Sequence, residues 1–281
     1  DIQSIKMVIM INFRLIIKKI NKLKSNKAKN FFLKKKLLLK QIDQNKFKKS
    51  IHNLNSSQVK EKIKKKFYPN IEQLYFIYNI ITIFKRVTVL EFGVGWSTKI
   101  ISTALLENKK KYHKKIRNLR YTNSFELFSI DNYKKYLNKT KKSLDKDQKK
   151  ITTFYYSDVK MSEFKKRICT EYEKLPKINP DLIFIDGPSQ FKVKGKINNI
   201  NTSHPDLAPI SMDVVKIEPF LRPGTILLID GRALNALFLK NFFYRNWNYK
   251  YFRNYDLHFF FLNGPTLGLL NERQLKFYKI K

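Results

Sequence analysis

Cysteine is almost absent from this chain of 281 residues, in which Cys169 is the single example. One cysteine cannot form a disulfide framework within the chain, and it excludes a metal site built on several cysteines. We therefore expect a cytoplasmic protein, because a reducing compartment is where chains without disulfides are common. Hydrophobic residues make up 43% of the sequence, which is enough to bury the core of one large domain.

Acidic residues are also scarce, with 22 Asp and Glu against 58 Lys and Arg and a formal net charge of +36. A charge of this size is typical of proteins that bind nucleic acid. However, Lys, Asn, Ile, Phe and Tyr are abundant together, and all five have A/T-rich codons. Lys also outnumbers Arg, although the planar guanidinium is the better phosphate ligand. Codon bias is therefore the favoured explanation of the charge, and a polyanion partner is the alternative.

Glycine and proline are missing from residues 1–66, which hold 20 basic and three acidic residues and a net charge of +17. Apolar residues recur there at helical spacing, as at Phe13, Ile16, Ile17, Ile20 and Leu23. We predict a basic, amphipathic helical extension over 1–66, followed by a single domain over 67–281. Two partners are left open for the extension: nucleic acid, and an anionic membrane surface on which it would lie as an interfacial helix.

From residue 67 onward, short apolar segments alternate with periodic polar ones. Strands are predicted at 87–92, 126–130, 151–156, 181–185 and 225–229. Helices are predicted at 71–84, 97–108, 133–144, 162–173, 211–220 and 233–244, and an antiparallel pair of strands at 248–255 and 257–263. This alternation predicts an α/β fold with a doubly wound, mostly parallel sheet of seven strands and an antiparallel C-terminal strand.

The junction between the first predicted strand and its helix reads Glu91-Phe92-Gly93-Val94-Gly95-Trp96-Ser97-Thr98. Glycines let the backbone approach a ligand, and the first N–H groups of a helix point outward without partners. Such a junction is typical of nucleotide-binding sites. A dinucleotide site needs a third small residue so that the helix can pack on the strand, and Thr98 stands at that position. A dinucleotide is therefore disfavoured.

Aspartates follow four of the predicted strands, at Asp131, Asp158, Asp186 and Asp230. Ligands of parallel sheets bind beyond the carboxyl ends of the strands, where these four side chains are expected to meet. Aspartate also forms turns in exposed loops. A series of four at the same edge nevertheless favours a binding site.

The order of these motifs resembles that of class I S-adenosylmethionine (SAM)-dependent methyltransferases over residues 67–263. The family's first four motifs are similar to residues 91–98, 128–131, 156–159 and 181–187, and its next turn and strand to 221–230. The resemblance implies a Rossmann-like fold, SAM as cofactor and a closing antiparallel pair of strands. Ile185-Asp186-Gly187 is most similar to the small-molecule branch, which includes macrocin O-methyltransferase-like and cephalosporin-hydroxylase-like proteins.

The same resemblance implies a set of cofactor-binding residues: Glu91, Gly93, Gly95, Ser97, Thr98, Asp131, Asp158 and Val159. The two glycines would let the backbone approach the methionine part and the ribose. Asp131 would accept both ribose hydroxyls, and Asp158 or the Val159 backbone would meet the adenine edge. Glu91 would either order the glycine turn or meet the amine of the ligand.

A base is needed only if the methyl acceptor still holds its proton, and the candidates are Asp186, Asp230 and His204. The two aspartates are expected side by side because their strands are neighbours. Two carboxylates also attract Mg²⁺, but Gly231 and Arg232 follow in place of a further acid. No residue is assigned as a metal ligand.

The polar loop over 189–204 is expected to cover the acceptor, and its lysines would suit an acidic small molecule: Lys192, Lys194 and Lys196. The leading prediction is thus a SAM-dependent methyltransferase that acts on an oxygen of a small molecule. Two other functions stay open. One is an RNA methyltransferase that grips its substrate with residues 1–66, and the other is a SAM-binding module without catalytic activity.

Overall fold

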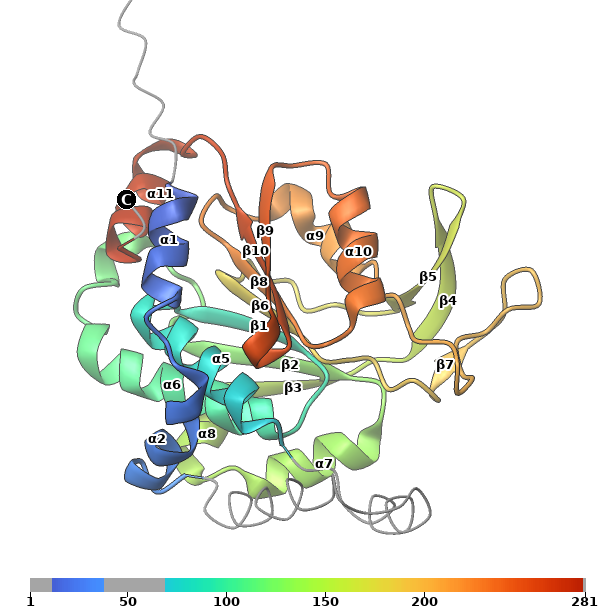
Figure 1. Cartoon of the computed structure of the whole chain (residues 1–281), viewed down its shortest axis with the longest axis horizontal. Helices are drawn as coiled ribbons and strands as arrows, with labels where there is room; N and C mark the ends of the chain where they lie inside the picture. Colours follow the sequence, from blue (N-terminus) through green and yellow to red (C-terminus); the bar gives the residue numbers. More distant parts are fainter. Residues whose placement is uncertain (1–11, 38–68, 280–281) are drawn as a thin grey trace, which may run out of the picture.

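A twisted sheet lies at the centre of the computed structural model, which describes residues 12–37 and 69–279 (Figure 1). Within these residues the sheet has seven strands in the order β3-β2-β1-β6-β8-β10-β9. Their bounds are β1 (Thr88–Phe92), β2 (Glu126–Asp131), β3 (Thr152–Tyr156), β6 (Leu182–Ile185), β8 (Ile226–Ile229), β9 (Trp247–Phe252) and β10 (Leu257–Leu262). Neighbours from β3 to β8 are parallel, and β10 runs antiparallel to both β8 and β9. The predicted fold class is confirmed.

Helices cover both faces of this sheet because its central strands are apolar on both sides. In β1, Val89 packs into one core, whereas Leu90 and Phe92 pack into the other, as expected for a strand whose side chains alternate. The first core is closed by α1 (Phe13–Ile20), α2 (Ala28–Lys34), α5 (Ile71–Ile83), α6 (Trp96–Tyr112) and α11 (Gly268–Phe277). The second is closed by α9 (Asp213–Ile217) and α10 (Ala233–Phe242). The polar helices α7 (Lys134–Ser143) and α8 (Lys146–Lys150) connect β2 to β3.

A helix predicted over 162–173 is wrong. The structure has a hairpin there, formed by β4 (Val159–Phe164) and β5 (Arg167–Tyr172), and β7 (Val193–Lys194) pairs with β4 to complete a second sheet. Phe164, Ile168 and Tyr172 are spaced by four residues, which imitates a helix. The turn makes this segment a hairpin and not a helix, because Lys165 and Lys166 adopt φ values of 47° and 61°. Two consecutive residues with positive φ are typical of a tight hairpin turn.

The described part of the predicted N-terminal extension packs against the sheet. Residues 13–20 and 28–34 are helical, as expected, and Ile16, Ile20 and Phe32 are fully buried in the first core. The connection between the two helices contains a short 3-10 helix, η1 (Ser25–Lys27). The predicted boundary between residues 66 and 67 lies outside the described residues.

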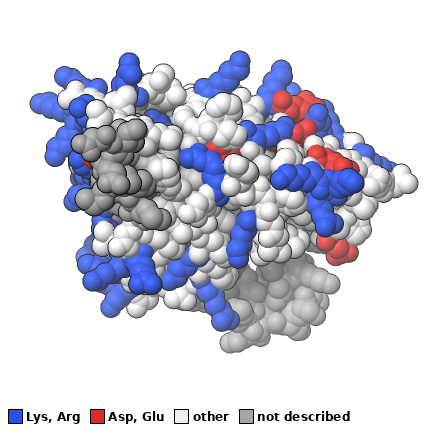
Figure 2. All heavy atoms as spheres, turned by 90° about the horizontal axis from the view of Figure 1, so that it is seen from above, with Lys and Arg blue, Asp and Glu red and all other residues white. Residues whose placement is uncertain are grey.

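The surface is strongly basic, in keeping with the composition. Lys and Arg side chains are spread over the whole face shown in Figure 2, and Asp and Glu side chains are few on it. Among residues 12–37 and 69–279, no helix combines the length and the apolar character that crossing a membrane requires.

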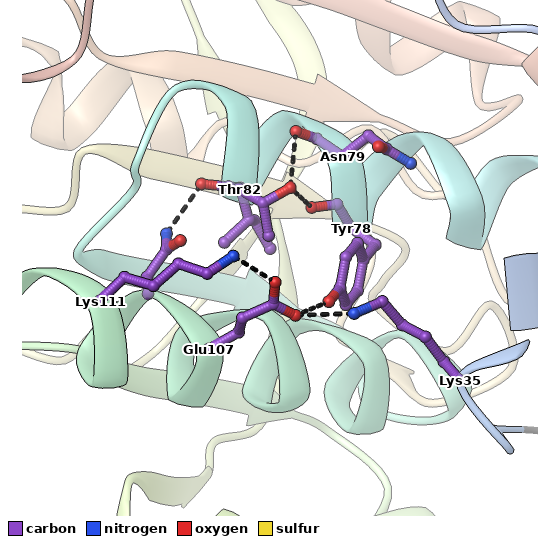
Figure 3. A network of polar contacts seen from close by, with 8 residues as sticks. Lys35, Tyr78, Asn79, Thr82, Glu107 and Lys111 are labelled. Carbon is purple, nitrogen blue, oxygen red and sulfur yellow. Dashed lines mark hydrogen bonds and ion pairs between the residues drawn. The ribbon is translucent and has the colours of Figure 1, made fainter.

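Glu107 of α6 ties the N-terminal helices to the rest of the structure (Figure 3). Its carboxylate accepts hydrogen bonds from Lys35 at 2.8 Å, from Lys111 at 2.7 Å, and from the hydroxyl of Tyr78 on α5. Burial raises the pKa of Glu107, but these three donors outweigh it and lower that pKa to about 2. Glu107 therefore links three helices while staying ionised.

Candidate functional site

Glu91 in β1 is fully buried beneath the glycine turn. Three hydroxyls donate to its carboxylate: Ser97 at 2.6 Å, Thr98 at 2.7 Å and Ser129 of β2 at 2.6 Å. Burial raises the pKa of Glu91 to about 7, against the lowering effect of these hydrogen bonds. The Thr98 hydroxyl also accepts the backbone N–H of Gly95 at 3.0 Å. Of the two roles considered for Glu91, its contacts are those of a residue that orders the turn.

The two glycines of the turn stand in different surroundings. Gly93 has a φ of +89°, and a Cβ atom there would lie 2.7 Å from the backbone of Asp186. The close approach at Gly93 is thus to the end of β6. A Cβ on Gly95 would meet nothing within 4 Å, so open space adjoins the first turn of α6. Gly95 is therefore the glycine beside which a ligand has room.

Asp131 joins the end of β2 to the glycine turn. Its carboxylate accepts the N–H of Val94 at 3.0 Å through one oxygen and that of Tyr133 at 2.8 Å through the other. Burial raises the pKa of Asp131 to about 6, although these backbone donors lower it. Each carboxylate oxygen keeps a further lone pair, so the group can still accept hydroxyls from a ligand.

Asp158 and Val159 are tied to the second sheet. The Asp158 carboxylate accepts the hydroxyl of Tyr156 and the ammonium of Lys194, both at 2.7 Å. These two donors lower the pKa of Asp158. Val159 is buried and pairs with Tyr172 on one side and Val193 on the other. Lys194 was expected to face the methyl acceptor. It instead binds Asp158 and so attaches the loop over 189–204 to the end of β3.

Asp186 and Asp230 come together as predicted from their strands. They directly follow Ile185 and Ile229, which are register partners in the parallel pair β6 and β8. Their carboxyl groups are within hydrogen-bonding range of each other, so a proton on one carboxyl group can be shared with the other. Burial and the facing carboxylate of Asp186 raise the pKa of Asp230. Asp186 is exposed to solvent, so water and small molecules can reach the pair from its side.

Arg232 brings a positive charge to this pair. Its Nε lies 3.2 Å from a carboxylate oxygen of Asp230, and its other nitrogens donate to the carbonyls of Asp186 at 3.1 Å and Pro188 at 3.2 Å. The sequence showed only that Arg232 follows the strand, not that it folds back over both strand ends. Across the described residues no cluster of three or more His, Cys, Asp or Glu could hold a metal ion.

The sequence placed His204 with the aspartate pair as a candidate base, but its side-chain contacts are with Asp206 of its own loop. His204 is exposed, and its Nδ1 accepts the N–H of Asp206 at 3.1 Å within a local turn. The neighbouring loop is instead held by Asn132, which accepts the N–H of Ser189 at 2.8 Å and donates to the carbonyl of Lys192 at 2.9 Å. Asn132 directly follows Asp131, the candidate for binding the ribose. The loop over 189–204, which was predicted to cover the methyl acceptor, is therefore attached beside Asp131.

Tyr172 of β5 was missed because its segment was predicted as a helix. The side chain is 2% exposed, its ring lies 5.5 Å from that of Phe92, and its hydroxyl has no hydrogen-bond partner among the described residues. Burial raises the pKa of Tyr172, and nearby Asp131, Asp213 and Asp186 contribute to this shift. Buried polar groups normally have partners. An unpaired donor near both candidate clusters therefore fits a site that receives a ligand.

No protein-family model matches the chain, and no curated protein matches its sequence.

Proposed function

We propose that this protein is a SAM-dependent methyltransferase that transfers a methyl group to an oxygen of a small molecule. The observation that carries the proposal is the junction of β1, β2 and α6. There, Asp131 holds the N–H of Val94 and Gly95 leaves open space at the start of the helix. The order of motifs along the chain supports the same cofactor.

The residues at this junction fit the cofactor chemically. Unpaired N–H groups at the start of α6 suit its carboxylate. The remaining lone pairs of Asp131 suit vicinal ribose hydroxyls. Glu91 and its three hydroxyl partners keep the turn in one conformation, so little ordering is left for ligand binding. Bound SAM supplies a methyl group on a sulfonium, and the chain supplies orientation and electrostatics.

The Asp186–Asp230 pair is the proposed base for a hydroxyl acceptor. Once the shared proton has been lost, a carboxylate of the pair can accept the acceptor's proton. Arg232 offsets the charge of the pair and fixes the backbone of both strand ends. The exposed Asp186 is the member that an acceptor can reach.

The proposal is tested by titrating S-adenosylhomocysteine into the purified full chain in a calorimeter. Asp131→Asn keeps the shape of the side chain but loses its charge, and we expect affinity to fall by about tenfold or more, which corresponds to about 1.4 kcal/mol. Asp145→Asn is the matched control, because Asp145 also accepts a backbone N–H, that of Gln148 at 2.8 Å, but caps α8. Equal affinity of the two variants, or no binding by the wild type, would contradict the proposal.

A second experiment separates an enzyme from a binding module. Methyl transfer from labelled SAM is measured over a panel of hydroxylated small molecules and a single-stranded RNA. Transfer to a small molecule supports the proposal. Tight cofactor binding without transfer to any acceptor would favour an inactive module, and transfer to the RNA alone would favour an RNA methyltransferase.

A further inference from the structure

Two cavities flank Asn21, where α1 lies beside β9. One has a volume of about 540 Å³ and is lined by residues between 20 and 26 and by residues 251–255. The other, of about 420 Å³, lies between α1 and Lys250. Neither is lined by any of the strand-end aspartates or by the glycine turn. This region is therefore separate from the proposed methyltransferase site.

Cationic side chains line both cavities, and no acidic side chain does. Lys24 and Arg253 line the larger one, and Arg14, Lys18 and Lys250 line the smaller. None of the five forms an ion pair with an acid of the described residues. Like charges gathered in a concave surface reinforce one another's potential. The cavities therefore favour an anion.

The backbone that carries Arg14 and Lys18 is held in place because α1 is fastened to the sheet. Ile16 and Ile20 are fully buried, and the ring of Phe13 lies 6.4 Å from the rings of both Phe259 and Phe261 on β10. The apolar face of α1 is thus occupied by protein. Insertion of that face into a bilayer would require these side chains to leave the core, so lipid is disfavoured as the occupant.

We propose that the two cavities form one binding site for a small ligand that carries two or more phosphate groups. The cations lie in two groups on either side of Asn21, which suits a ligand with separated charges. Arg253 can bind phosphate oxygens in a bidentate manner, and the lysines act as point charges. Cavities of this size are typical of small-molecule sites, which span roughly 300–1,000 Å³.

The larger cavity also offers contacts for the uncharged part of such a ligand. Amide groups of Asn21, Asn26 and Asn254 provide hydrogen bonds, and Leu23 and Tyr251, which are not fully buried, provide apolar surface. A free inorganic polyphosphate would use only the cations, whereas an organic phosphate would use both kinds of contact. Tripolyphosphate is therefore the minimal probe of the site.

The test is a calorimetric titration of tripolyphosphate into the full chain at near-physiological salt, where diffuse attraction is screened. We expect Lys24→Ala/Arg253→Ala to weaken binding by about tenfold or more, because hydrogen bonds between charged groups are strong. The double variant Lys18→Ala/Lys250→Ala tests the smaller cavity in the same way, and it should also weaken tripolyphosphate binding. The matched control is Lys135→Ala/Lys139→Ala, which removes the same charge from exposed positions on α7, the helix that contacts β3 at the opposite edge of the sheet.

If the cavity variants and the control weaken binding equally, the binding is only diffuse attraction to a chain of net charge +36. That result would overturn the proposal. Absence of binding by the wild type would overturn it as well. Two further arms use vesicles of phosphatidylcholine and phosphatidylserine and a short single-stranded RNA. Binding of either that depends on Lys24 and Arg253, without tripolyphosphate binding, would assign the surface to that macromolecule instead. Arg253→Lys, which keeps the charge but loses the bidentate contact, should weaken binding less than Arg253→Ala does.

Discussion

Gly93 and Gly187 pack backbone against backbone. A Cβ atom on Gly93 would lie 2.8 Å from the nitrogen of Gly187, and a Cβ on Gly187 would lie 2.7 Å from the nitrogen of Gly93. The turn after β1 and the turn after β6 therefore meet without any side chain between them. This contact places the glycine turn directly beside the first residue of the aspartate pair.

Alanine at Gly93 or Gly187 should destabilise the protein by about 2 kcal/mol or more, because the backbone of the facing turn has to move. Gly93→Ala also requires alanine to adopt a positive φ. Urea denaturation measures the effect. Gly195→Ala is the control, since Gly195 has a φ of +75° but a Cβ there meets nothing within 4 Å. A cost at Gly187 no larger than at Gly195 would contradict the packing argument.

Glu91→Gln should change how stability depends on pH. The folded-state pKa of Glu91, about 7, lies above its ordinary value of 4.5, so the folded protein holds this proton more tightly than the unfolded chain. The stabilisation from the proton is complete below about pH 4.5 and is lost as the pH rises toward 7. Glutamine removes this contribution. We therefore expect the wild type to lose more unfolding free energy than the variant between these pH values, measured by urea denaturation. Parallel curves would be inconsistent with a raised pKa.

Glu107→Gln should weaken the attachment of α2 and lower stability by about 1 kcal/mol at neutral pH, since a partly exposed ion-pair network is involved. Here the pKa is lowered, from 4.5 to about 2, so the stabilisation is present above pH 4.5 and is lost as the pH falls toward 2. Thermal unfolding at several pH values measures both effects. Asp147→Asn, which removes the exposed pair with Lys150, should leave stability nearly unchanged. A similar loss in both variants would argue against a special role for Glu107.

Asp230→Asn should lower the rate of methyl transfer to a hydroxyl acceptor while leaving the affinity for S-adenosylhomocysteine within about twofold. The reason is that Asp230 follows β8, and β6 separates β8 from the cofactor-binding candidates on β1 and β2. In the wild type, the rate should rise with pH as the pair loses its shared proton, and this rise should disappear in the variant. Unchanged turnover would remove the pair from the proposed chemistry.

Local sequence patterns were sufficient to predict the main sheet. The strands β1, β6 and β8 at its centre are short apolar runs that are buried on both faces, and the acids that follow such runs mark their carboxyl ends. The aspartate pair could be predicted for the same reason, since parallel neighbours end at the same edge. The hairpin of β4 and β5 was not predicted, because a spacing of four residues suits either type of element until a partner strand is present. No element was predicted for the segment that forms α11.

The sequence by itself determined the strands of the main sheet, which turns hold glycine and which strand ends carry an acid, because these depend on neighbours along the chain. Only the tertiary structure decided what each side chain meets. Glu91 accepts a hydrogen bond from Ser129, the backbone of Gly93 packs against that of Gly187, and Asp158 forms an ion pair with Lys194. Such partners are separated by 36 to 94 positions in the sequence. Hydrogen bonds and close packing act over a few ångströms in space, so they form only after the fold has brought distant segments together.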